Sequence, residues 1–198
     1  MTHIPDEIES KFYPVNIEEI RKSLVLLGAK CKSPMRLMRR SVYDHHKNPQ
    51  IPVAYIRIRD EGDKITFSAK DYADPERGHV HQRELVVNVD DFQKTVDLMK
   101  LIGLIQTNYQ ESKRETWELG GVEVCIDVWP GLLPYIEIEA PSVQQVNELY
   151  SKLPLQNSKR YEGGLLKVYM EVYGWEKTEA HKHVEFMTFE KVDFEKKY

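Results

Sequence analysis

The sequence predicts an α+β fold whose sheet is largely antiparallel. About eight stretches alternate apolar and polar residues at the spacing of β-strands, and three or four others repeat apolar residues at helical spacing. Most of the strand-like stretches follow one another through short turns, which is typical of antiparallel hairpins. The chain of 198 residues suits a single domain, with its core at about 4–175 and a C-terminal extension at 176–198.

In the first half of the chain, turns and helix signals separate the predicted elements. Asn16 has the side chain of a helix N-cap and Gly28 is a natural helix end, while Asp90 or Asp91 opens the next helix. The predicted strands cover 4–13, 29–44, 53–59, 64–70 and 81–89, and the predicted helices cover 16–28 and 90–101.

The second half of the chain continues with strands and then becomes more helical. Ser142 is expected to start a third helix, and the charged tail is expected to alternate through Val184, Phe186 and Phe189. The predicted strands are 104–117, 122–128 and 134–139, and a further helix is predicted at 165–173.

The composition limits the classes of partner. The net charge of −4 does not favour general nucleic-acid binding, which relies on excess positive charge. No apolar run approaches the roughly 18–20 residues that span a bilayer, so no membrane association is expected. The first residues lack the apolar core of a secretion signal, and we expect a cytoplasmic protein.

Acidic residues recur at strand spacing near both ends of the predicted sheet. Glu7 and Glu9 would share one face of the first strand, as would Glu137 and Glu139 on a late strand. Several carboxylates on one face repel each other unless a cation lies between them, and Mg²⁺ or Mn²⁺ prefers oxygen ligands. Adding Asp127, these five residues predict a divalent metal site.

Basic residues supply the opposite charge at similar spacing. Two arginines two residues apart on a strand could merely protect a sheet edge, and exposed charges are usually only solvated. Several separate strands contribute such clusters, however, and a curled sheet would bring them into one interior. Arginine binds phosphate oxygens through two parallel hydrogen bonds, so the pattern predicts a site for metal-bound triphosphate. The basic candidates are Lys11, Arg57, Arg59, Lys70, Lys113 and Arg114.

The motif Glu7-x-Glu9-x-Lys11 resembles the signature of the CYTH superfamily, the triphosphate tunnel metalloenzymes. That group includes class IV adenylyl cyclases, thiamine triphosphatases and inorganic triphosphatases. The resemblance covers roughly residues 5–140, and it implies an eight-stranded antiparallel β-barrel, or tunnel, with flanking helices. It continues in order through Val42-Tyr43-Asp44, Arg57-x-Arg59, Lys70, Arg114, Asp127, Gly131 and the stretch Tyr135 to Glu139.

The resemblance also implies roles for individual residues. Mg²⁺ or Mn²⁺ would be bound by Glu7, Glu9, Asp127, Glu137 and Glu139, and triphosphate by Lys11, Arg57, Arg59, Lys70 and Arg114. The sequence departs from the family pattern at two places. The family often has Lys-x-Arg where this chain has Ser112 before Arg114, with Lys113 shifted by one position and kept as a lower-ranked phosphate ligand. Of the alternating glutamates usual on the strand near residue 84, only Glu84 is present, as a secondary candidate.

Three functions are compatible with this pattern. The first is hydrolysis of inorganic triphosphate, thiamine triphosphate or another organic triphosphate, with Glu7, Glu9, Glu137 and Glu139 as catalytic acids. In it, a second metal, or an acid such as Glu139 or Glu9, would position the attacking water. The second is a class IV adenylyl cyclase, which makes cyclic AMP and pyrophosphate from ATP. The third is a nucleotide- or polyphosphate-binding module without catalysis. Either a monomer or a homodimer is expected.

Overall fold

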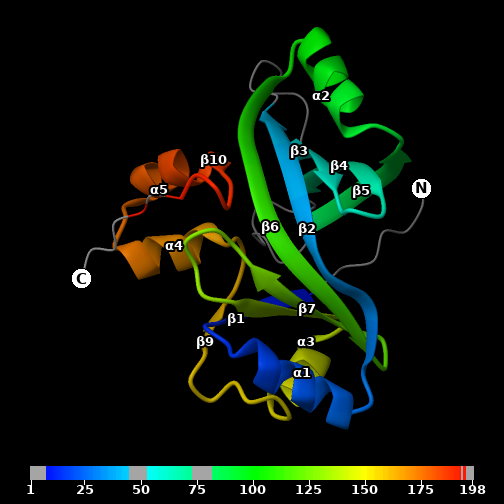
Figure 1. The fold of residues 1–198 in the computed structure, drawn as a ribbon, viewed down its shortest axis with the longest axis vertical. Coiled ribbons are helices and arrows are strands. Elements are labelled where there is room, and N and C mark those ends of the chain that lie inside the picture. The colour runs from blue at the N-terminus through cyan, green and yellow to red at the C-terminus, as the bar shows by residue number, and fades with distance from the viewer. Residues whose placement is uncertain (1–7, 45–52, 73–81, 193, 195–198) are drawn as a thin grey trace.

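The structure is a computed structural model that describes residues 8–44, 53–72, 82–192 and 194 (Figure 1). Its strands are β1 (Ile8–Tyr13), β2 (Lys30–Asp44), β3 (Val53–Asp60), β4 (Ile65–Tyr72), β5 (Gln82–Val89), β6 (Ile105–Leu119), β7 (Val122–Val128), β8 (Tyr135–Ala140), β9 (Lys159–Tyr161) and β10 (Phe186–Met187). Its helices are α1 (Ile17–Leu26), α2 (Phe92–Leu101), α3 (Val143–Tyr150), α4 (Leu166–Tyr173) and α5 (Lys177–Val184).

The first three helices begin where side chains can accept hydrogen bonds from the first free backbone N–H groups. The Asn16 carboxamide oxygen accepts from the backbone N–H groups of Glu18 and Glu19, at 3.0 and 3.3 Å. Asp91 caps α2 and Ser142 caps α3 in the same way. These caps confirm the predicted helix starts.

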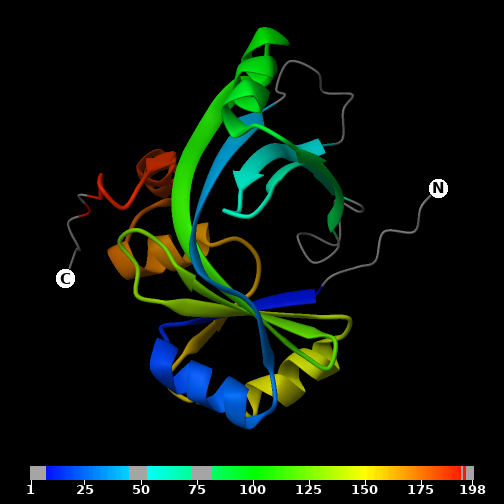
Figure 2. The ribbon, with the colours of Figure 1, turned by 45° about the vertical axis from the view of Figure 1, so that its right-hand side comes forward.

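All described strands join one curled sheet, and the predicted α+β class is confirmed. The order is β5-β4-β3-β2-β6-β7-β8-β1-β9, with antiparallel pairing throughout, and β10 pairs with β6 in parallel. The predicted barrel of eight strands needs correction, because the sheet has ten strands and its end strands β5 and β9 do not pair within the described residues. The two long strands β2 and β6 form the spine from which the sheet curls (Figure 2).

Helices α1, α2 and α3 cover one side of the curled sheet, whereas α4 and α5 pack against Tyr13 and Tyr135 on the other side. Phe12, Ile136 and Ile138 are fully buried and pack against Ile20 of α1 and Val146 of α3. In Figure 2, α1 and α3 lie below β1 and β7, and α2 lies at the far end of β6. Helices α1 to α3 therefore bury one face of the sheet, and the other face carries polar side chains beyond the part that α4 and α5 cover.

The C-terminal region differs from the predicted alternating tail. Residues 177–184 form helix α5, and only Phe186 and Met187 form a strand. Val184 and Phe186 are two residues apart, as in a strand, but they belong to different elements. Helix α5 ends at Val184, and strand β10 begins at Phe186. Within the described residues, no helix combines the length and apolarity that a bilayer crossing requires.

A buried carboxylate links α1 to β6 on the helix-covered side. Glu115 is 5% exposed, and its oxygens accept from Arg21 Nε at 3.1 Å and Arg21 Nη2 at 2.7 Å. The indole Nε1 of Trp117 donates to the same carboxylate at 2.7 Å. Burial alone would raise the pKa of Glu115, but Arg21 and Trp117 outweigh it and the pKa is lowered.

The substitution Glu115→Gln is expected to reduce the free energy of unfolding at pH 7 by about 1–3 kcal/mol, because it removes a charge-assisted network. Since the folded pKa is lowered, this contribution is complete above the unfolded pKa of about 4.3 and is lost as pH falls through the folded pKa. Urea unfolding of the wild type and of Glu115→Gln between pH 3 and 7 measures this difference in the free energy of unfolding. The exposed Glu148→Gln variant is the control, and a gap between wild type and Glu115→Gln that stays constant to pH 3 would contradict the assignment.

Candidate functional site

One face of the sheet gathers charged side chains from the neighbouring strands β3, β2, β6, β7, β8 and β1. Residues directly opposite each other in antiparallel strands point to the same face. Lys11 lies opposite Glu137, Asp127 opposite Arg114, and Arg40 opposite Arg59. We call this surface the charged face, formed by Glu9, Lys11, Glu123, Glu137, Glu139, Asp127, Arg114, Arg40, Arg57 and Arg59.

At one side of the charged face, Lys11 is enclosed by carboxylates. Its side chain is 5% exposed, and Nζ lies 2.8 Å from Glu9 Oε1 and 3.2 Å from Glu137 Oε1. Burial lowers the pKa of Lys11, but the two glutamates more than compensate and the pKa lies above its usual value. Lys11 is therefore a fixed cation among β1, β7 and β8, which carry the carboxylates of the charged face and are here called the acidic strands.

Arg114 connects these acidic strands to the rest of the sheet. Its Nε and Nη2 donate to the two oxygens of Asp127, each at 2.8 Å, and Nη2 also contacts Glu137 Oε2 at 2.6 Å. Burial tends to raise the pKa of Glu137, but Lys11 and Arg114 lower it well below its usual range. Burial raises the pKa of Asp127, which is 1% exposed, and Arg114 opposes that rise.

The opposite side of the charged face is basic. Arg57 Nη2 lies 2.7 Å from Glu84 Oε1 of β5, whereas Arg59 makes no ion pair within the described part of the chain. Burial, followed by the charges of Arg57, Arg114 and Arg40, lowers the pKa of Arg59 to about 9. An arginine held among three others favours an anion beside it. Arg40, Arg57 and Arg59 are here called the basic half.

The structure brings most of the predicted residues together and separates one of them. Lys113 points to the other face of β6, where its Nζ lies 4.9 Å from the centre of the Phe189 ring, so it does not belong to the charged face. Ser112 and Arg114 alternate with Lys113 and share the charged face. Glu7 and the side chain of Lys70 lie outside the described part of the chain, although the backbone of Lys70 pairs with that of Glu84.

Two residues of this face were missed from the sequence. Arg40 lies opposite both Arg59 and Gln110, and Glu123 lies opposite Glu139. Strand alternation through Cys125 to Asp127 places Glu123 on the same face, so the signal for it was present. Nothing in the sequence distinguishes Arg40 from Arg39, because either could face inward.

Comparison with known families agrees with this geometry. Residues 6–165 match the CYTH domain family. The chain belongs to the CYTH family. No curated protein matches the chain.

Solved structures resemble the CYTH fold of this chain at low sequence identity. A conserved hypothetical protein from Pyrococcus furiosus aligns with a TM-score of 0.62 at 21% identity, covering 76% of this chain and 91% of its own. A candidate adenylate cyclase from Vibrio parahaemolyticus aligns with a TM-score of 0.69 at 12% identity, covering 84% and 99%. A candidate adenylyl cyclase from Hippeastrum, described as having a dominant triphosphatase activity, gives 0.53 at 14%, covering 83% and 94%. These similarities establish the fold.

The carboxylates of this CYTH chain suit a hard divalent cation. Glu9 and Glu139 lie opposite each other and are at least partly exposed, and Glu9 also contacts Lys11. Glu137 and Asp127 are more buried and contact Arg114. Within the described residues, no three acidic, His or Cys side chains are grouped closely enough to hold a metal. Mg²⁺ commonly takes only one or two carboxylates and completes its shell with water and substrate phosphates, so the donor set fits.

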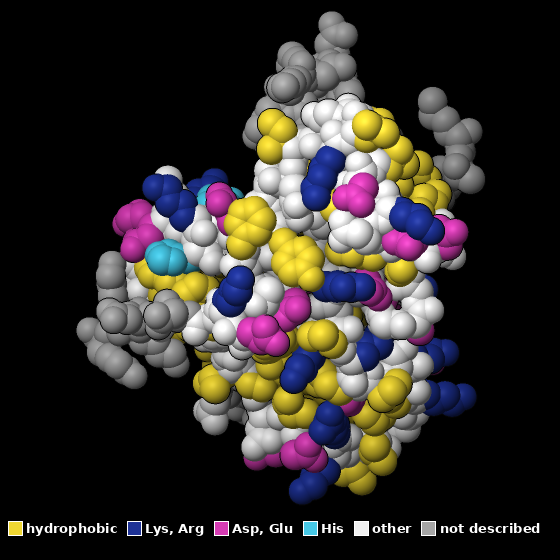
Figure 3. Space-filling view, turned by 45° about the horizontal axis from the view of Figure 1, so that its top comes forward, with side chains coloured by type: hydrophobic (Ala, Val, Ile, Leu, Met, Phe, Trp, Pro, Cys, Tyr) yellow, Lys and Arg dark blue, Asp and Glu magenta, His cyan; other side chains and the backbone are white. Residues whose placement is uncertain are grey.

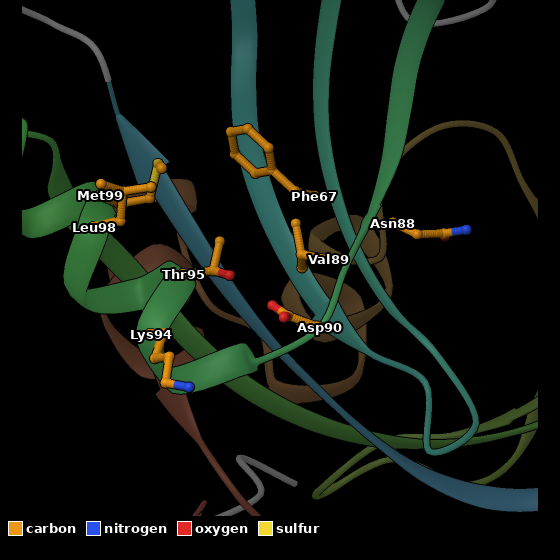
Figure 4. A pocket seen from close by; sticks show the side chains of 8 residues that line it. All are labelled: Phe67, Asn88, Val89, Asp90, Lys94, Thr95, Leu98 and Met99. Carbon is orange, nitrogen blue, oxygen red and sulfur yellow. The ribbon is translucent and has the colours of Figure 1, made fainter.

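Among the described residues, the outer side of the sheet carries an apolar groove. A groove of about 720 Å³ lies between α2 and the outer side of β4 and β5, lined mainly by apolar side chains such as Phe67, Val89 and Met99 (Figure 4). The side chain of Asn88 points away from α2 in that view. On the face drawn in Figure 3, acidic and basic side chains are interspersed. On the charged face, by contrast, three arginines lie together beside strands that carry several carboxylates, and we place the candidate site there.

The substitution Arg59→Met is expected to raise the free energy of unfolding, on the order of 1 kcal/mol, because it removes a cation that other arginines repel. Arg114→Met should instead lower it by about 3–5 kcal/mol, since it leaves the carboxylate of Asp127 buried without its partner. Urea unfolding without triphosphate measures both. A destabilised Arg59→Met variant would show that Arg59 supports the fold and is not held in place for a ligand.

Proposed function

We propose that this protein is a metal-dependent triphosphate hydrolase whose substrate binds on the charged face. The observation that carries the proposal is Arg59, which lies among Arg40, Arg57 and Arg114 without an ion pair in the described part of the chain. A site that concentrates cations in this way suits a ligand with several negative charges. Membership of the CYTH family supports the same substrate class.

The basic half would hold the phosphate chain, and Arg114 would mark its boundary with the acidic strands. Guanidinium groups bind phosphate oxygens through paired hydrogen bonds of fixed geometry, so two arginines can fix the direction of an extended triphosphate. Arg57 is already ordered by Glu84, which reduces the conformational entropy lost on binding. Lys70 is proposed as a further phosphate ligand.

The acidic strands would hold Mg²⁺ or Mn²⁺ through Glu9 and Glu139, with Glu7 as a further proposed ligand. The bound metal would supply neutralisation of charge on the transferred phosphoryl group. Glu139 also serves as the acceptor that orients a water for in-line attack, because a carboxylate beside the phosphate chain accepts the water's hydrogen bond. Glu137 stays ionised between Lys11 and Arg114 and keeps both cations in position.

ATP cyclisation is the second candidate, because a candidate adenylate cyclase from Vibrio parahaemolyticus shares the fold. Here the same basic half would hold ATP while its 3′-hydroxyl attacks the α-phosphate and pyrophosphate leaves. A binding module without catalysis is the third candidate. The acidic side of the charged face argues for catalysis, since binding polyphosphate alone requires cations.

The products distinguish these three functions. Purified protein with inorganic triphosphate, thiamine triphosphate or ATP, each with Mg²⁺ or Mn²⁺, is expected to release orthophosphate. Cyclic AMP with pyrophosphate from ATP would overturn the hydrolase in favour of the cyclase. Tight triphosphate binding with no turnover in either metal would leave only the binding module.

The substitution Glu139→Gln is expected to reduce kcat for triphosphate hydrolysis by roughly 100-fold or more, because it removes a charge that acts in the transition state. Circular dichroism and thermal unfolding should match the wild type, since Glu139 is only partly buried. Glu148→Gln, on the exposed side of α3, is the matched control. Near-normal turnover by Glu139→Gln would remove it from the proposed catalytic site.

A further inference from the structure

Arg40 lies inside the basic half although its neighbour Arg39 faces the other way. On β2, Arg40 is directly opposite Arg59 of β3 on one side and Gln110 of β6 on the other. Arg39 instead pairs with Asp60 at 2.9 Å and lies over the ring of Phe92 from α2. The two adjacent arginines therefore belong to opposite faces of one strand.

Gln110 and Trp129 both contact the guanidinium of Arg40. Its Nε donates to Gln110 Oε1 at 2.7 Å, and its Cζ lies 4.6 Å from the centre of the Trp129 ring. Trp129 is 6% exposed, and its Nε1 has no hydrogen-bond partner within the described residues. The indole thus supports the cation through its ring face and helps to orient the guanidinium.

The charge of Arg40 acts within the same space as the other site cations. Burial lowers the pKa of Arg59 most, followed by the charges of Arg57 and Arg114, and the charge of Arg40 lowers it further. Arg40 also opposes the rise in the pKa of Tyr135, which burial causes on β8. A phosphate chain bound beside Arg59 would therefore lie within the field of Arg40 as well.

The C-terminal region holds the amide that orients Arg40. Gln110 Nε2 donates to the backbone carbonyl of Val184 at the end of α5. The backbone of β6 is joined to the same segment, because Tyr109 N–H donates to the Glu185 carbonyl at 2.8 Å. Glu111 Oε2 accepts from the backbone N–H of Phe189 at 3.1 Å. With Gln110 fixed by Val184, its carboxamide oxygen remains directed at Arg40.

We propose that Arg40 is a further triphosphate-binding residue and that Gln110, fixed by the segment that ends α5, is its positioning residue. The inference rests on the proposed function, because it concerns how the same site binds its substrate. It also assigns a role to the C-terminal extension, whose Val184 carbonyl accepts the hydrogen bond that fixes the Gln110 amide of β6. In the rival interpretation, Arg40 only fills the space between β6 and Trp129 and never contacts substrate.

Binding of inorganic triphosphate to the full-length chain without metal, followed by isothermal titration calorimetry, tests the role of Arg40. Arg40→Ala is expected to raise the dissociation constant at least tenfold, and Arg40→Lys to recover part of that loss because it keeps the charge. Arg39→Ala is the matched control, and its dissociation constant should stay within twofold of the wild type. If Arg40→Ala does not fold, Arg40→Lys still tests the role, since its affinity should lie below that of the wild type.

The role of Gln110 is tested by Gln110→Met, which keeps the volume and loses both hydrogen bonds. We expect a several-fold rise in KM with kcat nearly unchanged, and no further loss when it is combined with Arg40→Ala. Additive losses in the double variant would overturn the positioning role.

Wild-type affinity in Arg40→Ala, alongside weakened binding by Arg59→Met, would overturn the role of Arg40 and leave the proposed function intact. A wild-type protein that neither binds nor hydrolyses triphosphate would instead contradict the proposed function itself.

Discussion

The charged face depends on the contact of Arg114 with Asp127 and Glu137. Asp127 is almost completely buried, and a buried carboxylate without a cation would cost several kcal/mol. Arg114 provides that cation and also reaches Glu137, which in turn contacts Lys11. Four strands are thus joined by one ionic network across the middle of the sheet. Its two cations and two carboxylates balance one another in charge.

Beyond this network, the strands sort charge by sign. Glu9, Glu123 and Glu139 lie on the strands to one side, and Arg40, Arg57 and Arg59 lie on β2 and β3 to the other. An acidic and a basic region on one concave surface create a field with a fixed direction. A metal-bound triphosphate carries the complementary distribution, with its cation beside carboxylates and its phosphates beside guanidinium groups. Like charges held close together reduce stability, which is common at functional sites.

Alternation along strands was sufficient to predict which side chains share much of the charged face, and their role in binding stays a prediction. It placed Glu137 and Lys11 correctly, and it separates Arg114 from Lys113, which the structure places on the other face. It could not choose between Arg39 and Arg40, because β2 contains register shifts between Cys31 and Ser33 and between Ser33 and Arg36. Whether the sheet closes, and whether the tail is helical, depend on contacts between distant segments that local periodicity does not contain.

The C-terminal extension is better described as part of the sheet than as an appendage. β7 pairs with β6 only from Lys113 onwards, so the earlier half of that edge of β6 is open to another strand. β10 occupies it, pairing Phe186 with Tyr109 and Met187 with Gln110. Since this stretch of β6 also faces β2, the extension lies one strand away from Arg40. Changes in the extension can therefore alter the geometry of the basic half without touching any residue of the acidic strands.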